Sequence, residues 1–140
     1  MICFTVEGCP VAKARARVTI KKGIVRGYTP TKTVNYENLI ALYGKQVMAL
    51  RLPLLGPISM GLSIYMGIPI SWSKRKKRLA IQGDIYPTSK PDSSNIQKSV
   101  EDALNGICYL DDAQIVDHII TKRYSEFPRV EIRIYSVKRT

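Results

Sequence analysis

Hydrophobic residues alternate with polar ones in four segments of the chain and recur at helical spacing in two others. Alternation predicts half-buried strands at residues 2–6, 58–70, 115–122 and 130–137, because successive side chains of a strand point to opposite faces. Apolar residues three or four positions apart predict a helix at about 34–50 that covers the sheet. The same spacing predicts a second helix, from residue 94 or 95 to the glycine at 106. A chain of 140 residues fits one domain, spanning residues 1–140.

Residues 52–73 carry no charge, a feature shared with membrane-spanning segments. Within this stretch, however, isoleucine, leucine and methionine alternate with serine, glycine and tyrosine, and Pro53, Pro57 and Pro69 interrupt it. Prolines at these positions disfavour a spanning helix. We therefore expect a strand here and no association with a membrane.

The composition points to a polyanionic partner. Lys and Arg number 22 against 11 Asp and Glu, a formal charge of +11, and such a surface attracts nucleic acid or anionic lipid. One histidine and three scattered cysteines cannot form a zinc finger, so any catalytic metal must be held mainly by oxygen. The odd cysteine count favours a reducing, cytoplasmic location over a secreted disulfide framework.

Two basic segments are candidates for DNA contact. Lys13, Arg15 and Arg17 occupy alternate positions and would line one face of an extended chain. Five consecutive cations follow the long strand, and we expect them to become ordered only on an anion. They are Lys74, Arg75, Lys76, Lys77 and Arg78. The alternatives for this run are a solvated loop and a localisation-like tract. The neighbouring Trp72 would either stack on a base or anchor the strand end.

Acidic residues concentrate in the second half of the chain, where six of the eleven lie within residues 92–117. Lys98 and Asp102 are i, i+4 neighbours on the polar face of the second helix, with Asp92 before it and Asp111 and Asp112 beyond it. One interpretation is a surface ion pair followed by a turn. The other is a magnesium site, since a hard divalent cation relieves carboxylate repulsion and activates water at a phosphate. A nearby lysine would then stabilise charge on the phosphate.

The motifs in this region resemble those of the RusA-type Holliday-junction resolvases. They are K-P-D-S-S-N at residues 90–95, the lysine at 98, D-A-L-N-G at 102–106 and D-D-A-Q at 111–114. Near the N-terminus, G-C-P-V-A-K at 8–13 and Y-T-P at 28–30 are similar to segments of phage and prophage members. The motifs follow in the family's order over nearly the whole chain.

The resemblance implies an α/β (α+β) fold, with a mixed sheet flanked by helices in a single domain. It implies a homodimeric, Mg²⁺-dependent endonuclease that cuts four-way junction DNA by paired nicks, one per subunit. Asp92 and Asp112 match acidic active-site positions and Lys98 matches the catalytic lysine, while Asp111 matches the acid that precedes the second of these positions. Asp92, Asp111 and Asp112 are thus the expected metal ligands.

Ser94 departs from the family pattern, because it stands where a second aspartate is expected. A hydroxyl carries no charge and is a weak magnesium ligand. With Ser94 at this catalytic position, the site has lost one of three expected carboxylates. Ser94 and Gln97 fit a helix capping box, which predicts that the helix is kept while the metal site is weakened. The sequence therefore leaves three hypotheses: a junction-resolving endonuclease impaired by Ser94, a non-catalytic junction-binding protein, and a basic module that contacts RNA or a protein.

Overall fold

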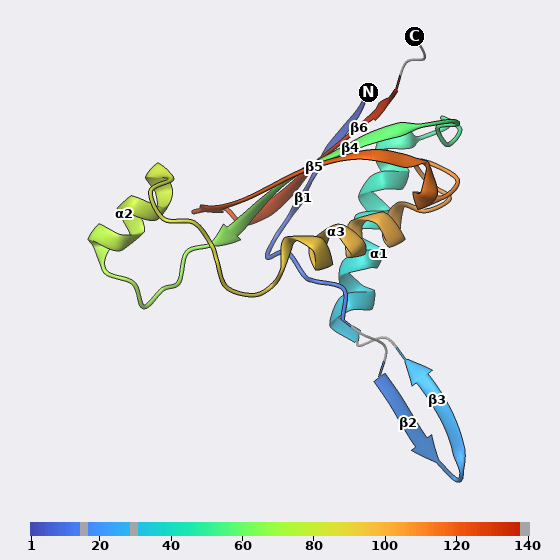
Figure 1. Ribbon diagram of the computed structural model, residues 1–140, viewed down its shortest axis with the longest axis horizontal. Coiled ribbons are helices and arrows are strands. Elements are labelled where there is room, and N and C mark those ends of the chain that lie inside the picture. Colours follow the sequence, from blue (N-terminus) through green and yellow to red (C-terminus); the bar gives the residue numbers. More distant parts are fainter. Residues whose placement is uncertain (15–16, 29–30, 138–140) are drawn as a thin grey trace.

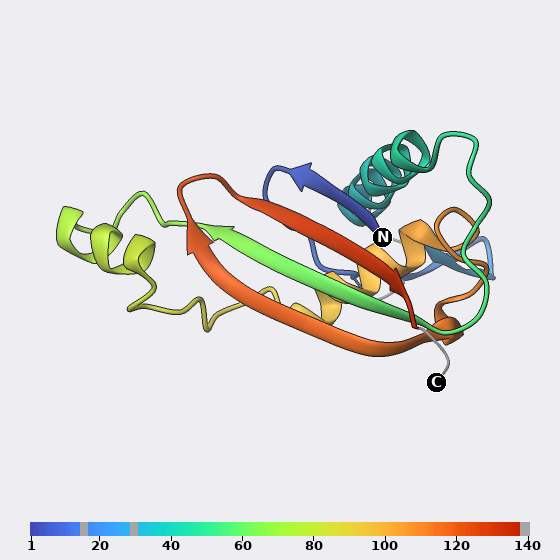
Figure 2. The same cartoon turned by 90° about the horizontal axis from the view of Figure 1, so that it is seen from above.

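Four strands from both ends and the middle of the chain form one sheet (Figures 1 and 2). In a computed structural model, which describes residues 1–14, 17–28 and 31–137, they are β1 (Ile2–Glu7), β4 (Ile58–Gly67), β5 (Ile115–Ser125) and β6 (Arg129–Ser136). Their order is β1-β6-β4-β5, with β5 parallel to β4 and the other neighbours antiparallel. The four predicted strands are confirmed, and the sheet is mixed as expected.

Alternation along β4 separates the two faces of the sheet. The side chains buried on the helix-covered face are those of Ile58, Met60, Leu62 and Ile64. Ser59 and Ser63, which point to the opposite face, are only partly buried. The uncharged stretch is therefore a strand, and in the described part of the chain no helix is long and apolar enough to cross a membrane.

Helices α1 (Thr31–Met48) and α3 (Ser93–Leu104) pack side by side on one face of the sheet (Figure 1). Apolar residues of both helices join those of the strands in one core. Gly44 allows the close approach of the two helices, because a Cβ atom there would lie 2.6 Å from Cδ2 of Leu104. Both predicted helices are confirmed, and together with the mixed sheet they make one α+β domain.

A two-stranded hairpin, β2 (Arg17–Lys21) and β3 (Ile24–Tyr28), extends away from the sheet (Figure 1). Its turn consists of Lys22 and Gly23, both with positive φ (52° and 76°). This is the backbone that a two-residue turn between twisted strands requires. The hairpin is not among the predicted elements, because the cations in and before it were considered only as candidates for DNA contact.

The five-cation run was expected to be ordered only on an anion, and this expectation is wrong. Residues Lys74–Gln82 form helix α2, which projects beyond the far end of the sheet (Figure 1). Ser73 caps its N-terminus by accepting the Lys76 N–H at 3.2 Å, and Gly83 ends it in the left-handed conformation (φ 86°). Lysine and arginine are also good helix formers, so the two capping residues define a helix despite the like charges.

Candidate active site

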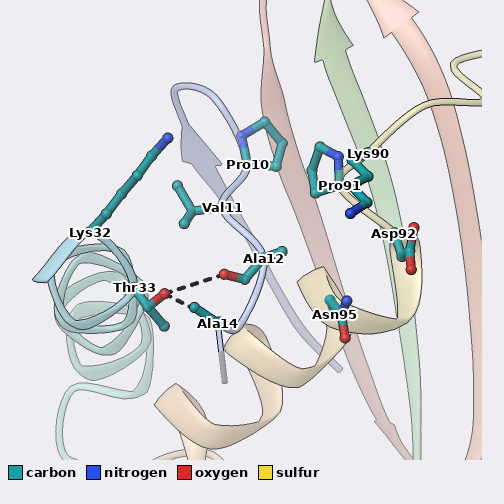
Figure 3. A pocket seen from close by; sticks show the side chains of 10 residues that line it. All are labelled: Pro10, Val11, Ala12, Ala14, Lys32, Thr33, Lys90, Pro91, Asp92 and Asn95. Atoms are coloured by element: carbon teal, nitrogen blue, oxygen red, sulfur yellow. Dashed lines mark hydrogen bonds between the residues drawn. The ribbon is translucent and has the colours of Figure 1, made fainter. Parts of the chain in front are cut away.

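Asp92 lies immediately before α3, at its N-cap position. Its backbone is extended (φ −69°, ψ 142°), and its carboxylate makes no capping hydrogen bond. It lines a pocket of about 590 Å³ together with Lys90, Asn95 and Lys32 of α1 (Figure 3). The other lining residues are Pro10, Val11, Ala12, Ala14, Thr33 and Pro91. The segments with motifs 8–13 and 90–95, far apart in sequence, thus meet around Asp92.

Ser94 does not cap α3, which corrects the expected capping box. It lies inside the helix with an exposed side chain, one residue after Ser93 begins it. Gln97 instead donates to Oε1 of Glu101 at 2.9 Å and lies 2.8 Å from Nδ1 of His118. An aspartate at position 94 is therefore not required to start the helix.

Gln114 fixes the loop that carries Asp111 and Asp112. Its Oε1 accepts the N–H groups of Leu110 and Asp111 at 2.8 and 2.9 Å. Its Nε2 donates to the carbonyls of Leu54 and Gly56, both at 2.9 Å. Asp111 completes a capping box with Gln114 by accepting the Ala113 N–H at 3.1 Å. The glutamine of the D-D-A-Q motif therefore has a positioning role that the sequence alone did not reveal.

The adjacent carboxyl groups of Asp111 and Asp112 have pKa values shifted in opposite directions. Hydrogen bonds from the backbone N–H of Ala113 and from the Asp112 carboxyl lower the pKa of Asp111 below its ordinary value. The pKa of Asp112 is raised, chiefly by its hydrogen bond to Asp111, then by burial and the Asp111 charge. Lys98 opposes that shift and Asp102 adds to it, so α3 brings both side chains into electrostatic reach of Asp112.

Lys13 joins three parts of the site. Its backbone N–H donates to the Asn95 carbonyl at 2.8 Å. Its Nζ lies 2.6 Å from Oε1 of Glu37 and 3.4 Å from Oδ2 of Asp102, and the hydrogen bond to Glu37 contributes most to raising the Lys13 pKa. The positive charge that was predicted to contact DNA is therefore paired within the protein. Arg15 lies outside the described residues, and for Arg17 only the backbone, in β2, is described.

The expected metal ligands do not form a three-carboxylate cluster. Across residues 1–14, 17–28 and 31–137, no three His, Cys, Asp or Glu side chains come close enough to hold a metal ion together. The structure instead places Asp111 beside Asp112 and Lys98 near Asp112, with Asp92 at the start of α3. The candidate oxygen donors are thus the adjacent carboxylates of Asp111 and Asp112 and the separate carboxylate of Asp92.

The basic candidates on α2 lie at the other end of the sheet (Figure 1). All except the partly buried Lys77 are exposed, and α2 contains no acidic residue. Nζ of Lys76 lies 4.0 Å from the centre of the Trp72 ring, and that ring meets Tyr124 of β5 edge to face at 5.2 Å. Trp72 therefore anchors the strand end, one of its two expected roles.

Comparison with known proteins decides the family. A family model described as "Endodeoxyribonuclease RusA" matches residues 7–135, which include every candidate acidic and lysine residue of the site. The chain belongs to the RusA endodeoxyribonuclease family. It is also 43% identical to the "Uncharacterized protein YqaN" of Bacillus subtilis (strain 168) over 138 residues, 97% of this chain and 96% of that protein. The resemblance to RusA-type Holliday-junction resolvases is thereby confirmed, and RusA membership indicates an endodeoxyribonuclease.

Proposed function

We propose that this RusA-family protein resolves four-way DNA junctions by Mg²⁺-dependent hydrolysis of phosphodiester bonds. The observation that carries the proposal is the family match over residues 7–135. It is supported by the position of Lys98, a cation within electrostatic reach of Asp112. A lysine beside a carboxylate is suited to a reaction in which negative charge builds on a phosphate next to a bound cation.

The donor atoms fit magnesium better than any softer metal. Mg²⁺ is usually held by one or two carboxylates, with water and substrate phosphate completing its shell, so a three-carboxylate cluster is not required. Asp111 and Asp112 supply two adjacent carboxylates, and Asp92, without a capping bond, supplies the third candidate. When bound, magnesium would polarise the phosphate and lower the pKa of water.

The protein's own residues would orient the phosphate and balance its charge. Lys98 projects from the polar face of α3 and is exposed to solvent, where a DNA backbone can approach it. Asp112 lies beside Asp111 and within electrostatic reach of Lys98, so the two carboxylates would hold the cation next to the phosphate that Lys98 contacts. Gln114 would keep these carboxylates in place through its bonds to backbone carbonyls.

Two subunits would be needed for paired nicks. Each chain offers one set of Asp92, Lys98 and Asp112, whereas resolution of a four-way junction requires cuts in two strands. We therefore propose a homodimer with one nick per subunit, in agreement with the family resemblance. Sedimentation of the free protein and of its junction complex would measure the number of subunits.

Ser94 should lower the rate without preventing junction binding. Restoring a carboxylate with Ser94→Asp at this exposed helical position is expected to raise the cleavage rate in Mg²⁺ by tenfold or more, with cuts at the same phosphates. Ser93→Asp, one residue earlier, is the matched control and should give little gain. The measurement is single-turnover cleavage of a synthetic four-way junction by each protein.

A non-catalytic junction binder is the second candidate, favoured by Ser94, which stands where the family pattern has a second aspartate. It predicts that wild type and Ser94→Asp both bind the junction tightly and that neither cuts it. If neither protein prefers the junction to a duplex of equal length, both candidate functions are wrong.

A further inference from the structure

The far end of the sheet, next to α2, carries a group of aromatic side chains that the proposed cleavage reaction does not use. We call this group the aromatic tip, and it consists of Tyr65, Trp72, Tyr86, Tyr124 and Phe127. It contains residues from β4, the segments on either side of α2, β5 and the β5–β6 turn.

Cations cover three of these rings. Lys76 lies 4.0 Å from the centre of Trp72, Arg129 lies 3.9 Å from that of Tyr65, and Arg123 lies 4.8 Å from that of Tyr86. Such contacts hold the rings in place. Arg129 is itself paired with Glu131 at 3.1 Å, so Lys76 and Arg123 supply the net positive charge around the rings. The aromatic tip is therefore both apolar and cationic, which suits a ligand with flat rings and attached phosphates.

Phe127 is the most exposed residue of the aromatic tip. It is 73% exposed, and among the residues that the structure describes no cation or aromatic ring stacks on it. The turn that presents it is fixed, because its N–H donates to Oγ of Ser125 at 3.1 Å and its carbonyl accepts from Nη1 of Arg129 at 2.9 Å. A large apolar side chain is thus held toward water in a defined position.

A cleft of about 320 Å³ lies beside this ring. It is lined by Tyr65, Ile81, Tyr124, Ser125, Glu126 and Phe127. Ile81 of α2 is 50% exposed there, so the cleft has an open apolar wall next to the basic helix. Its volume is at the low end of the range of about 300–1,000 Å³ that is typical of small-molecule pockets.

The aromatic tip is close enough to the candidate active site to act on the same DNA molecule. Nζ of Lys122 in β5 donates to the Ser89 carbonyl at 2.8 Å, which ties β5 to the segment leading to Asp92. Asp92 is three residues beyond Ser89, at most about 11 Å along an extended chain, and Tyr124 is two residues beyond Lys122, at most about 7 Å. Only Asp92 is joined to the aromatic tip by this short path. Asp111 and Asp112 precede the start of β5, roughly 30 Å from Tyr124 along the strand, so DNA bound at both sites would run along the length of β5.

We propose that the cleft beside Phe127 binds an unpaired DNA base from the branch point of the junction, an inference that rests on the proposed function. Aromatic side chains stack on any base, and apolar side chains can occupy the gap where bases unstack. The five cations of α2, with no acidic residue on that helix, would hold the flanking phosphates. A base pair at the branch point lacks a continuous stack and opens at lower cost than a pair inside a duplex, so the cleft favours branched over linear DNA.

The test measures junction and duplex affinities of the full chain with Mg²⁺ withheld. Phe127→Ala is expected to weaken junction binding about fivefold or more and to leave duplex binding unchanged. Phe127→Tyr should retain the wild-type preference, and Phe127→Leu, which keeps an apolar side chain without a ring, should lose most of it. Leu50→Ala, at a fully exposed leucine away from the aromatic tip, is the matched control and should change neither affinity.

A junction with abasic sites at the branch point identifies the ligand as a base. On this DNA, Phe127→Ala and wild type should bind equally, because the base is already absent. An equal loss on intact and abasic junctions would overturn the base-binding proposal and indicate an apolar protein or backbone contact. Unchanged junction preference in Phe127→Ala would also overturn it while leaving the proposed function intact. Loss of junction preference in the wild type itself would instead overturn the proposed function.

Discussion

At the scale of single residues, the candidate site is held in place by polar side chains that do not need to touch DNA. Gln114 fixes the Asp111–Asp112 loop through four hydrogen bonds to the backbone. Lys13 links Glu37 of α1 to Asp102 of α3. Both belong to motifs that the resemblance covers, and the structure gives each a positioning role.

Lys13 should contribute stability that depends on pH in the alkaline range. Its folded-state pKa is raised above 10.5, so its ion pairs are fully formed below that pH and are lost as the pH rises through the folded-state pKa. We expect Lys13→Met to lower the free energy of unfolding by up to about 1 kcal/mol at pH 7 and by progressively less above pH 10.5. Urea denaturation between pH 7 and 11.5 measures this difference.

Lys45→Met, on the exposed surface of α1, is the matched control for this series. It should change the free energy of unfolding by only a few tenths of a kcal/mol at pH 7. A Lys13→Met effect that stays constant up to pH 11.5 would show that packing of the side chain, and not its charge, accounts for the loss.

At the scale of elements, sequence periodicity predicted the helices and strands that form the core. It did not predict the two elements whose boundaries are set by capping residues and turns, the β2–β3 hairpin and α2. β1, α1, β4, α3, β5 and β6 each bury a regular apolar pattern, so their approximate positions could be read from the chain. Ala80 is the buried residue of α2, and Ile20 and Ile24 of the hairpin are exposed, so neither element shows such a pattern. The boundaries of the two elements depend on Gly23 and Gly83.

Motif order indicated the site residues. The Lys13 ion pairs and the Gln114 bonds to Leu54 and Gly56, however, join residues 24 to 89 positions apart and require the folded chain.

The C-terminal glycine of α2 offers a test of this element alone. A Cβ at Gly83 would meet no atom within 4 Å, so Gly83→Ala introduces backbone strain at φ 86° without a clash. We expect faster hydrogen exchange in residues 74–82, unchanged exchange in β4 and β6, and severalfold weaker DNA binding. The reason is that α2 would lose its defined end and hold its cations less firmly.

Gly23→Ala is the control, since it places the same kind of strain (φ 76°) in the hairpin turn. It should leave exchange in residues 74–82 at the wild-type rate. Equal exchange of α2 in Gly83→Ala and wild type would contradict the role assigned to this cap.

At the scale of the whole molecule, positive charge and carboxylates are divided along the chain. Through Gly83 there are 14 basic and 2 acidic residues, and after it 8 basic and 9 acidic. The basic helix α2 lies at the far end of the sheet (Figure 1). The candidate carboxylates of the second part lie at α3 and in the loop before β5. One end of the molecule is thereby suited to grip the phosphate backbone, while the carboxylates that would recruit magnesium lie along α3 and beyond it.

The most direct test of this account is to map the cuts made in a four-way junction by wild type and Asp112→Asn in Mg²⁺. Asp112→Asn keeps the shape of the side chain and removes the charge that faces Lys98. The account predicts paired nicks near the branch point by the wild type, none in a duplex of equal length, and a loss of at least 100-fold in rate for Asp112→Asn with junction binding retained. Equal cleavage of junction and duplex, or full activity of Asp112→Asn, would contradict it.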